Sequence, residues 1–169
     1  MQIQNLADLY GLEPVPWSRV LAGLESFGGG PEARSFLATT RPDGRPHLAG
    51  IGAVWLDGRA WFVSGRETRK SRNVAANPAC SISMSLPDMD VVVEGHARVV
   101  TDEPTLRKLA AKYGEGGWPA RVEDGAFTYD YSAPSAGPPP WFLYEVEPTQ
   151  VFCVLAAEPG GATRYRFDE

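Results

Sequence analysis

The chain has 169 residues, of which 43% are hydrophobic and 11% aromatic, and its formal net charge at pH 7 is -5. This composition predicts a single soluble globular domain, residues 1–169, long enough to form a core without metal or disulfides. The negative net charge argues against a general nucleic-acid binder or a binder of anionic membranes. Residues 1–14 lack the basic and apolar regions of an export signal, and no apolar run is as long as a transmembrane helix, so we expect a cytoplasmic protein.

Residues 1–34 are expected to form an N-terminal helical segment. Between residues 17 and 27, apolar side chains recur at the spacing of an amphipathic helix, after Pro16 and before a glycine run at 28–30. The apolar face of this helix is expected to lie on the core.

Two turn sequences follow, Pro-Asp-Gly at 42–44 and Asp-Gly at 57–58, each between short apolar runs. Both sequences favour tight turns between antiparallel strands. Two hairpins in succession indicate an antiparallel sheet. The expected strands are residues 35–40, 46–56 and 59–64.

The stretch 60–84 is the most informative part of the chain. It predicts a strand, a short polar turn, a helix at residues 69–76 and a second strand at 80–86. Thr68 can cap the helix by accepting a hydrogen bond from a backbone N–H of its first turn, and Pro78 prevents its continuation.

The N-terminus of this helix combines unpaired backbone N–H groups with Arg69, Lys70, Ser71 and Arg72. Backbone N–H groups, the helix dipole and cationic side chains together suit a phosphate or another multiply charged anion. The alternative is that the cations, with Arg66, form only a solvated helix face.

The rest of the chain predicts more sheet. A long strand at residues 91–101 contains Gly95, which marks a bulge or a bend at a barrel corner. A second helix starts at Pro104 and ends near Gly114. Residues 114–140 are rich in Gly, Pro and aromatic residues without any period, so we expect a long irregular loop. The closing strands are expected at residues 141–146, 149–155 and 163–167.

Seven or eight strands and two or three helices predict a mainly β protein, a small antiparallel barrel with helical covers. His47 and His96 have no partners at metal-ligand spacing, so no metal site is expected. Cys80 and Cys153 lie in apolar runs and are expected to be reduced core residues. Motifs of phosphate-binding loops, Rossmann folds and serine hydrolases are absent, so any enzymatic activity depends on a bound organic cofactor.

The run FVSGRETRKSRNVAANPACSISM, residues 62–84, resembles the phosphate-binding strand and helix of the pyridoxamine 5'-phosphate oxidase-like FMN-binding split barrels. The preceding hairpins and the run DVVVEGHARVVTD resemble other strands of that superfamily, so the resemblance covers about residues 35–167. The order Lys-Ser-Arg-Asn-Val at 70–74 and the ending TRYRF are similar to the flavin/deazaflavin oxidoreductase branch that uses coenzyme F-420. The resemblance implies a six- to seven-stranded antiparallel split β-barrel and a homodimer.

The resemblance also implies the cofactor site. The phosphate of the cofactor, F-420 (favoured) or FMN, would be held near the start of the helix at 69–76, and the strand at 50–54 would lie along its ring. The implied phosphate-site residues are Ser64, Arg69, Lys70, Ser71 and Arg72. The implied ring-site residues are Gly50, Ile51, Gly52, Ala53 and Val54.

The polyglutamate tail of F-420 would call for additional cations. Arg164 and Arg166, which strand alternation places on one face, are candidates together with Arg66. The alternative is that the two terminal arginines only cover apolar strand surface.

One departure from the family pattern concerns the activity. Pyridoxamine phosphate oxidases carry an Arg-x-Val-Leu-Leu-Lys motif on the ring strand, whereas residues 48–53 here read LAGIGA. The favoured hypothesis is therefore a flavin- or deazaflavin-dependent oxidoreductase that transfers hydride between its cofactor and a small organic substrate. The alternatives are a non-catalytic flavin, haem or tetrapyrrole carrier, a pyridoxamine phosphate oxidase-like FMN enzyme, and a barrel whose basic helix binds nucleic acid or an acidic protein. Nucleic-acid and membrane partners are not expected.

Overall fold

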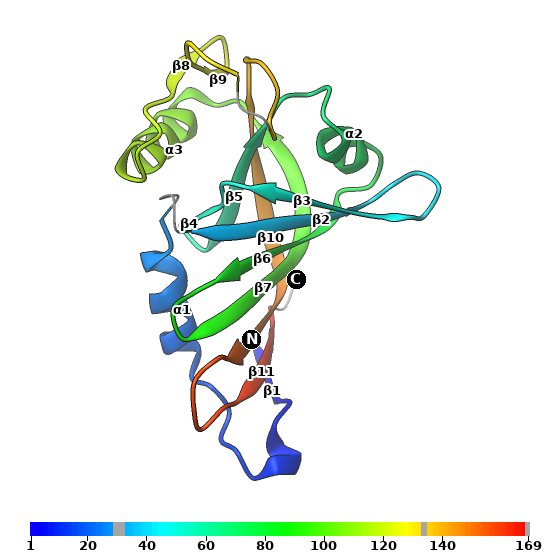
Figure 1. Cartoon of the computed structure of the whole chain (residues 1–169), viewed down its shortest axis with the longest axis vertical. Coiled ribbons are helices and arrows are strands. Elements are labelled where there is room, and N and C mark those ends of the chain that lie inside the picture. Colours follow the sequence, from blue (N-terminus) through cyan, green and yellow to red (C-terminus); the bar gives the residue numbers. More distant parts are fainter. Residues whose placement is uncertain (29–32, 133–134, 168–169) are drawn as a thin grey trace.

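The structure is a computed structural model and describes residues 1–28, 33–132 and 135–167. It is built around one antiparallel sheet with three helices outside it (Figure 1). The sheet consists of β1 (Gln2–Asn5), β2 (Arg34–Thr40), β3 (Pro46–Ile51), β4 (Val54–Leu56), β5 (Arg59–Ser64), β6 (Ala79–Ser85), β7 (Met89–Val100), β10 (Phe142–Leu155) and β11 (Ala162–Arg166). The helices are α1 (Trp17–Ser26), α2 (Arg69–Ala76) and α3 (Glu103–Glu115), with a 3-10 turn at η1 (Asp8–Tyr10) and a separate hairpin of β8 (Arg121–Glu123) and β9 (Ala126–Thr128).

The sheet closes on itself through one bent run of chain. Antiparallel pairs connect β3 to β2, β2 to β6, β6 to β7, β7 to β10, β10 to β5 and β5 to β4. Because β3 leads into β4 after a break at Gly52 and Ala53, the strand expected at 46–56 is present but divided, and it joins the two ends of the sheet.

The barrel is split along the long strand β10. One edge of β10 pairs with β7, and its other edge pairs with β5 at one end and β11 at the other. If β3 and β4 count as one strand, six strands form the closed part, and β11 is the seventh. The expected split β-barrel is therefore confirmed, with β1 as an additional strand beside β11.

Alternating side chains fill the interior of the barrel. In β2 and β6 every second residue is buried, as expected for strands with one face on a core. A second apolar cluster lies between α3, the β8–β9 hairpin and the start of β10, where Tyr113, Phe127 and Trp141 pack together. The barrel core includes Leu37, Phe62, Ile82, Met84, Val91, Val93, Val146 and Val151.

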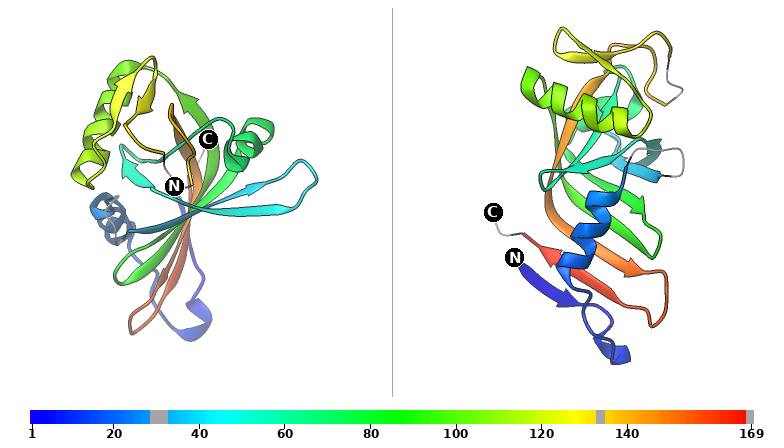
Figure 2. Two further views of the ribbon diagram at one scale, coloured as in Figure 1. Left: turned by 45° about the horizontal axis from the view of Figure 1, so that its top comes forward. Right: turned by 90° about the vertical axis from the view of Figure 1, so that its left-hand side faces the viewer.

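The helices cover different parts of the barrel. α1 packs against β4, α2 packs against β2, and α3 contacts the β8–β9 hairpin. Figure 2 shows α1 crossing one side of the sheet, while α3 and the hairpin lie together at one end. In Figure 1, α2 lies at that same end, and β1 and β11 lie at the opposite end.

Gly95 lies at the predicted irregularity of the long strand. It pairs with Pro148, and the register of β7 with β10 shifts between Pro148 and Gln150. A Cβ atom at Gly95 would be 1.9 Å from the Glu147 carbonyl oxygen, so only glycine allows this approach. The predicted bulge is therefore confirmed, although the extra residue is on β10.

Two expectations about local structure need correction, and a third is only partly covered. Residues 2–5 form β1 within a segment expected to be helical, and three of these four residues are exposed, so they give no apolar pattern. The loop 114–140 contains β8 and β9, whose three residues each are too short for a detectable period. The glycine run expected to follow α1 falls partly on residues 29–32, which lie outside the described residues.

Candidate functional site

The turn between β5 and α2 is built around Thr68. Its Oγ1 accepts a hydrogen bond from the Ser71 backbone N–H at 3.3 Å, which confirms the predicted cap. The same oxygen lies 2.8 Å from the Ser64 hydroxyl and 3.0 Å from the Ser71 hydroxyl. Ser64 and Ser71 are both buried, so their hydroxyls are hydrogen-bonded inside the turn and help to fix the start of α2.

Lys70 is the unexpected member of this helix. Its side chain is only 3% exposed, and its ammonium donates a hydrogen bond to the backbone carbonyl of Ser135. Burial lowers the pKa of Lys70 because the charged form loses hydration. Within residues 1–28, 33–132 and 135–167, no carboxylate forms an ion pair with it. The alternative of a solvated helix face is therefore wrong for Lys70.

The neighbouring arginines are exposed and differ in their partners. Arg72 forms an ion pair with Glu67 at 2.8 Å, and the guanidinium of Arg66 lies 3.9 Å from the centre of the Phe142 ring. Arg69 has no carboxylate partner in the described part of the chain. Arg69 and Lys70 thus carry positive charge that no acidic side chain of the described residues neutralises.

The five residues predicted along the ring occupy different environments. Ile51 and Gly52 line a pocket, whereas Ala53 and Val54 are buried in the two apolar cores. Gly50 is exposed on the other face of β3, opposite Phe36 of β2. The structure therefore brings only Ile51 and Gly52 of this set to a cavity.

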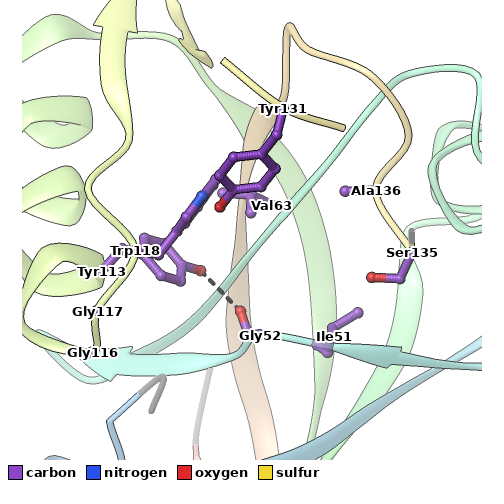
Figure 3. A pocket seen from close by; sticks show the side chains of 10 residues that line it. All are labelled: Ile51, Gly52, Val63, Tyr113, Gly116, Gly117, Trp118, Tyr131, Ser135 and Ala136. Atoms are coloured by element: carbon purple, nitrogen blue, oxygen red, sulfur yellow. Dashed lines mark hydrogen bonds between the residues drawn. The ribbon is translucent and has the colours of Figure 1, made fainter. Parts of the chain in front are cut away.

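That pocket has a volume of about 430 Å³ and lies between the end of β3, the end of α3 and the segment that begins at Ser135 (Figure 3). Three aromatic side chains, Tyr113, Trp118 and Tyr131, contribute to its wall, and none of its described lining residues is charged. The lining residues are Ile51, Gly52, Val63, Tyr113, Gly116, Gly117, Trp118, Tyr131, Ser135 and Ala136.

Tyr113 fixes the break between β3 and β4. Its hydroxyl donates a hydrogen bond to the Gly52 carbonyl at 3.1 Å, as drawn in Figure 3. The ring packs edge-on against Trp118. Burial raises the pKa of Tyr113, so this hydroxyl stays protonated and remains a donor.

A second cavity, of about 750 Å³, lies at the start of α2. Its lining includes Gly65, Arg66 and Thr68 on one side and the proline-rich segment 137–140 on the other. Ala136 borders both cavities, and its carbonyl accepts a hydrogen bond from the Gly65 N–H at 3.0 Å. The segment 135–138 therefore separates the aromatic pocket from the cavity beside α2.

The terminal arginines are not close to α2 in this structure. Arg164 and Arg166 share the outer face of β11, at the opposite end of the molecule in Figure 1. Arg164 donates a hydrogen bond to the Gln4 side chain at 3.1 Å, and its guanidinium lies 4.7 Å from the centre of the Phe152 ring. Their role toward a cofactor stays a prediction.

Other site types have little support in the described residues. No group of three or more His, Cys, Asp or Glu side chains there could hold a metal ion. Cys80 and Cys153 are buried free thiols, as expected. Every helix of the described chain is too short or too polar to cross a membrane.

Sequence reasoning missed part of the aromatic pocket. The sequence places Tyr113 in the helix expected to end near Gly114, and Trp118 and Tyr131 in the irregular loop expected at 114–140. The unusual aromatic content of 114–140 was the available signal. That these aromatic side chains meet Tyr113 in one cluster depends on how the loop packs against β5, which the local sequence does not show.

The strands, the capped basic helix and the adjacent aromatic pocket together define an antiparallel split barrel with a pocket at one end. A family model described as pyridoxamine 5'-phosphate oxidase matches residues 31–154, so the chain belongs to the pyridoxamine 5'-phosphate oxidase family. A curated relative, the pyridoxine/pyridoxamine 5'-phosphate oxidase of Pseudomonas entomophila, is 34% identical over 86 residues. That alignment covers 46% of this chain and only 40% of the length of the relative.

Two solved structures are similar along most of the chain. A pyridoxamine 5'-phosphate oxidase-related, FMN-binding protein from Nostoc punctiforme has a TM-score of 0.59 and 18% identity, covering 92% of both chains. A protein described as an F420 reductase has a TM-score of 0.51 and 26% identity, covering 76% of this chain and 95% of its own. The similarity to the Nostoc punctiforme protein shows that the two chains share the split-barrel fold.

Proposed function

We propose that this protein is an oxidoreductase that binds F-420 or FMN and transfers hydride between that cofactor and a small organic substrate. The observation that carries the proposal is Lys70, a buried cation without a carboxylate partner in the described residues. A buried charge is costly unless it is paired, and a cofactor phosphate would pair it. Arg69 and the positive end of the α2 dipole would add to the same site.

The aromatic pocket is the proposed binding site for the ring of the cofactor. Its described lining offers flat side chains and backbone but no charged group, which suits an uncharged fused ring. The bound cofactor would supply the hydride chemistry. The protein would contribute the rest: α2 holds the phosphate, Tyr113 fixes the backbone at Gly52, and the aromatic wall excludes water.

Oxidation of pyridoxamine phosphate is the less favoured activity. Its substrate carries a phosphate and an amine, and the described lining of the pocket has no side chain that would bind either charge. The family's Arg-x-Val-Leu-Leu-Lys motif is also absent from residues 48–53.

F-420 is favoured over FMN. The order Lys-Ser-Arg-Asn-Val at 70–74 resembles the F-420 branch, and the F420 reductase shares 26% of its sequence with this chain. The unneutralised charge of Arg69 and Lys70 suits a ligand with several negative charges. A homodimer forms part of this proposal.

The absorbance spectrum of the purified protein and mass spectrometry of the released ligand test the proposal first. Parallel titrations of ligand-free protein then rank the two cofactors. FMN binding about tenfold tighter than F-420, a difference of about 1.4 kcal/mol, would reverse the preference. A bound cofactor without hydride transfer to any acceptor would instead favour a carrier.

Replacing Lys70 tests the phosphate site directly. Lys70→Met keeps the length and burial of the side chain but removes the charge, so cofactor affinity should fall about 10- to 100-fold, as expected for loss of a charge-assisted hydrogen bond of about 1.5–3 kcal/mol. Fluorescence titration measures this change. Lys108→Met is the matched control, because Lys108 is exposed and pairs with Asp57. If the two variants bind the cofactor with equal affinity, Lys70 does not contribute to the phosphate site.

A further inference from the structure

His47 lies on the same face of β3 as Ile51. Along β3 the alternate residues His47, Ala49 and Ile51 are partly buried, while the residues between them are exposed. Ile51 borders the aromatic pocket, and His47 pairs across the sheet with Thr39 of β2, the strand that α2 covers. This face of β3 therefore leads from the pocket toward α2.

Hydrogen-bonding groups connect His47 to the basic helix. The Asn73 amide of α2 donates a hydrogen bond to Thr39 Oγ1 at 2.9 Å, and that oxygen lies 3.5 Å from His47 Nδ1. Asn73 and Thr39 are both buried. Two buried side chains, Asn73 and Thr39, thus connect α2 with the ring of His47.

The charged groups that act on His47 are all cations. Burial is the largest cause of the lowered pKa of His47, and Arg41 in the turn after β2 and Lys70 and Arg69 on α2 lower it further. Among the described residues none of these three forms an ion pair, and the Arg41 Nε is buried without a hydrogen-bond partner. Three cations from α2 and the turn after β2 thus act on His47, and no described carboxylate pairs with any of them.

We propose that Arg41 and His47 complete the anion site at the start of α2, and that His47 takes up a proton when a multiply charged anion binds. The inference rests on the proposed function and names two further residues of that site. The ligand class is a molecule with a flat ring at one end and a phosphate-bearing tail at the other. Ile51 and His47 are four positions apart along the strand, a span of about 13 Å, and the small Ala49 between them leaves space for a tail.

The direction of the pH effect follows from the charges. An anion beside Arg41, Arg69 and Lys70 offsets their repulsion of a proton on His47, so the pKa of His47 is higher in the complex than in the free protein. Linkage then requires affinity to rise as the pH falls through the pKa of the complex, and to level off below the pKa of the free protein.

FMN titrations across pH 5.5–8.5 test this effect with a matched pair of variants. His47→Gln removes the proton site, and His96→Gln removes the other histidine of the chain. The phosphate of FMN itself titrates near pH 6, but it does so equally in all variants. We expect the ratio of wild-type to His47→Gln affinity to rise at least about threefold toward low pH, whereas the ratio for His96→Gln stays flat.

NMR titration of the His47 ring in the wild-type protein gives an independent readout, with inorganic pyrophosphate and FMN as separate probes. Either probe at saturation should raise the pKa of His47, and Arg41→Ala should weaken pyrophosphate binding. An unshifted His47 pKa with both probes, or a flat affinity ratio, would overturn the inference. A shift with pyrophosphate but no binding of FMN or F-420 would contradict the cofactor proposal while retaining the anion site.

Discussion

Burial disfavours charge on two side chains near α2, with opposite consequences for the pKa. It lowers the pKa of Lys70, an amine, and raises the pKa of Cys80, a thiol, to about 12. For Lys70 the charged form is destabilised, and a bound anion would compensate. For Cys80 the protonated thiol is retained at physiological pH, and a protonated buried thiol is a poor nucleophile.

Both cysteines should therefore be unreactive in the folded protein. Cys153 is also buried, and its pKa is raised by the same cause. With the thiol reagent DTNB at pH 8, we expect no reaction on the timescale of minutes in buffer and reaction of two thiols per chain after unfolding in guanidinium chloride. Rapid modification of one thiol in buffer would contradict the buried placement.

At the residue scale, the sequence was sufficient to assign to the candidate site those residues that are neighbours along the chain. Thr68, Arg69 and Lys70 follow one another, so their common place at a helix start could be seen in advance. His47 and Tyr113 could not be assigned in this way. Each reaches the site through tertiary packing, His47 by pairing of β3 with β2 and Tyr113 by the docking of α3 at Gly52.

At the scale of elements, turn chemistry gave the most reliable predictions. Asp57 and Gly58 both have positive φ, at 53° and 71°, which is the conformation that the Asp-Gly sequence favours in a two-residue hairpin. The missed strands β1, β8 and β9 have three or four residues each. Strands this short are held by their partners, so local sequence carries little signal for them.

Gly95 offers a test of how β10 bends. Gly95→Ala would place Cβ against the Glu147 carbonyl, so the free energy of unfolding should fall by at least about 2 kcal/mol, near the upper end of the cost of overpacking. Gly114→Ala is the matched control, because nothing lies within 4 Å of its added Cβ and alanine favours helix by about 0.5–1 kcal/mol. Urea unfolding measures both. A Gly95→Ala protein as stable as wild type would refute the close approach.

At the scale of the whole molecule, the hairpin of β2 and β3 presents apolar side chains to solvent. Phe36 is 45% exposed and Leu48 is 65% exposed. They lie on one outer face, because Phe36 pairs with Gly50, two residues beyond Leu48 on β3. β3 is also the last strand in the order of the main sheet. Neighbouring exposed apolar side chains on an edge strand are typical of an interface.

The proposed homodimer should therefore depend on this face. Leu48→Glu places a charge there and should shift the protein from dimer to monomer at micromolar concentration, as measured by sedimentation velocity, because burying an unpaired carboxylate is costly. Leu9→Glu is the control, since Leu9 is 88% exposed on η1, far from β3 in Figure 1. A wild-type protein that sediments as a monomer would contradict the dimer. If both variants remain dimeric while the wild type is a dimer, the contact lies on another face of the barrel.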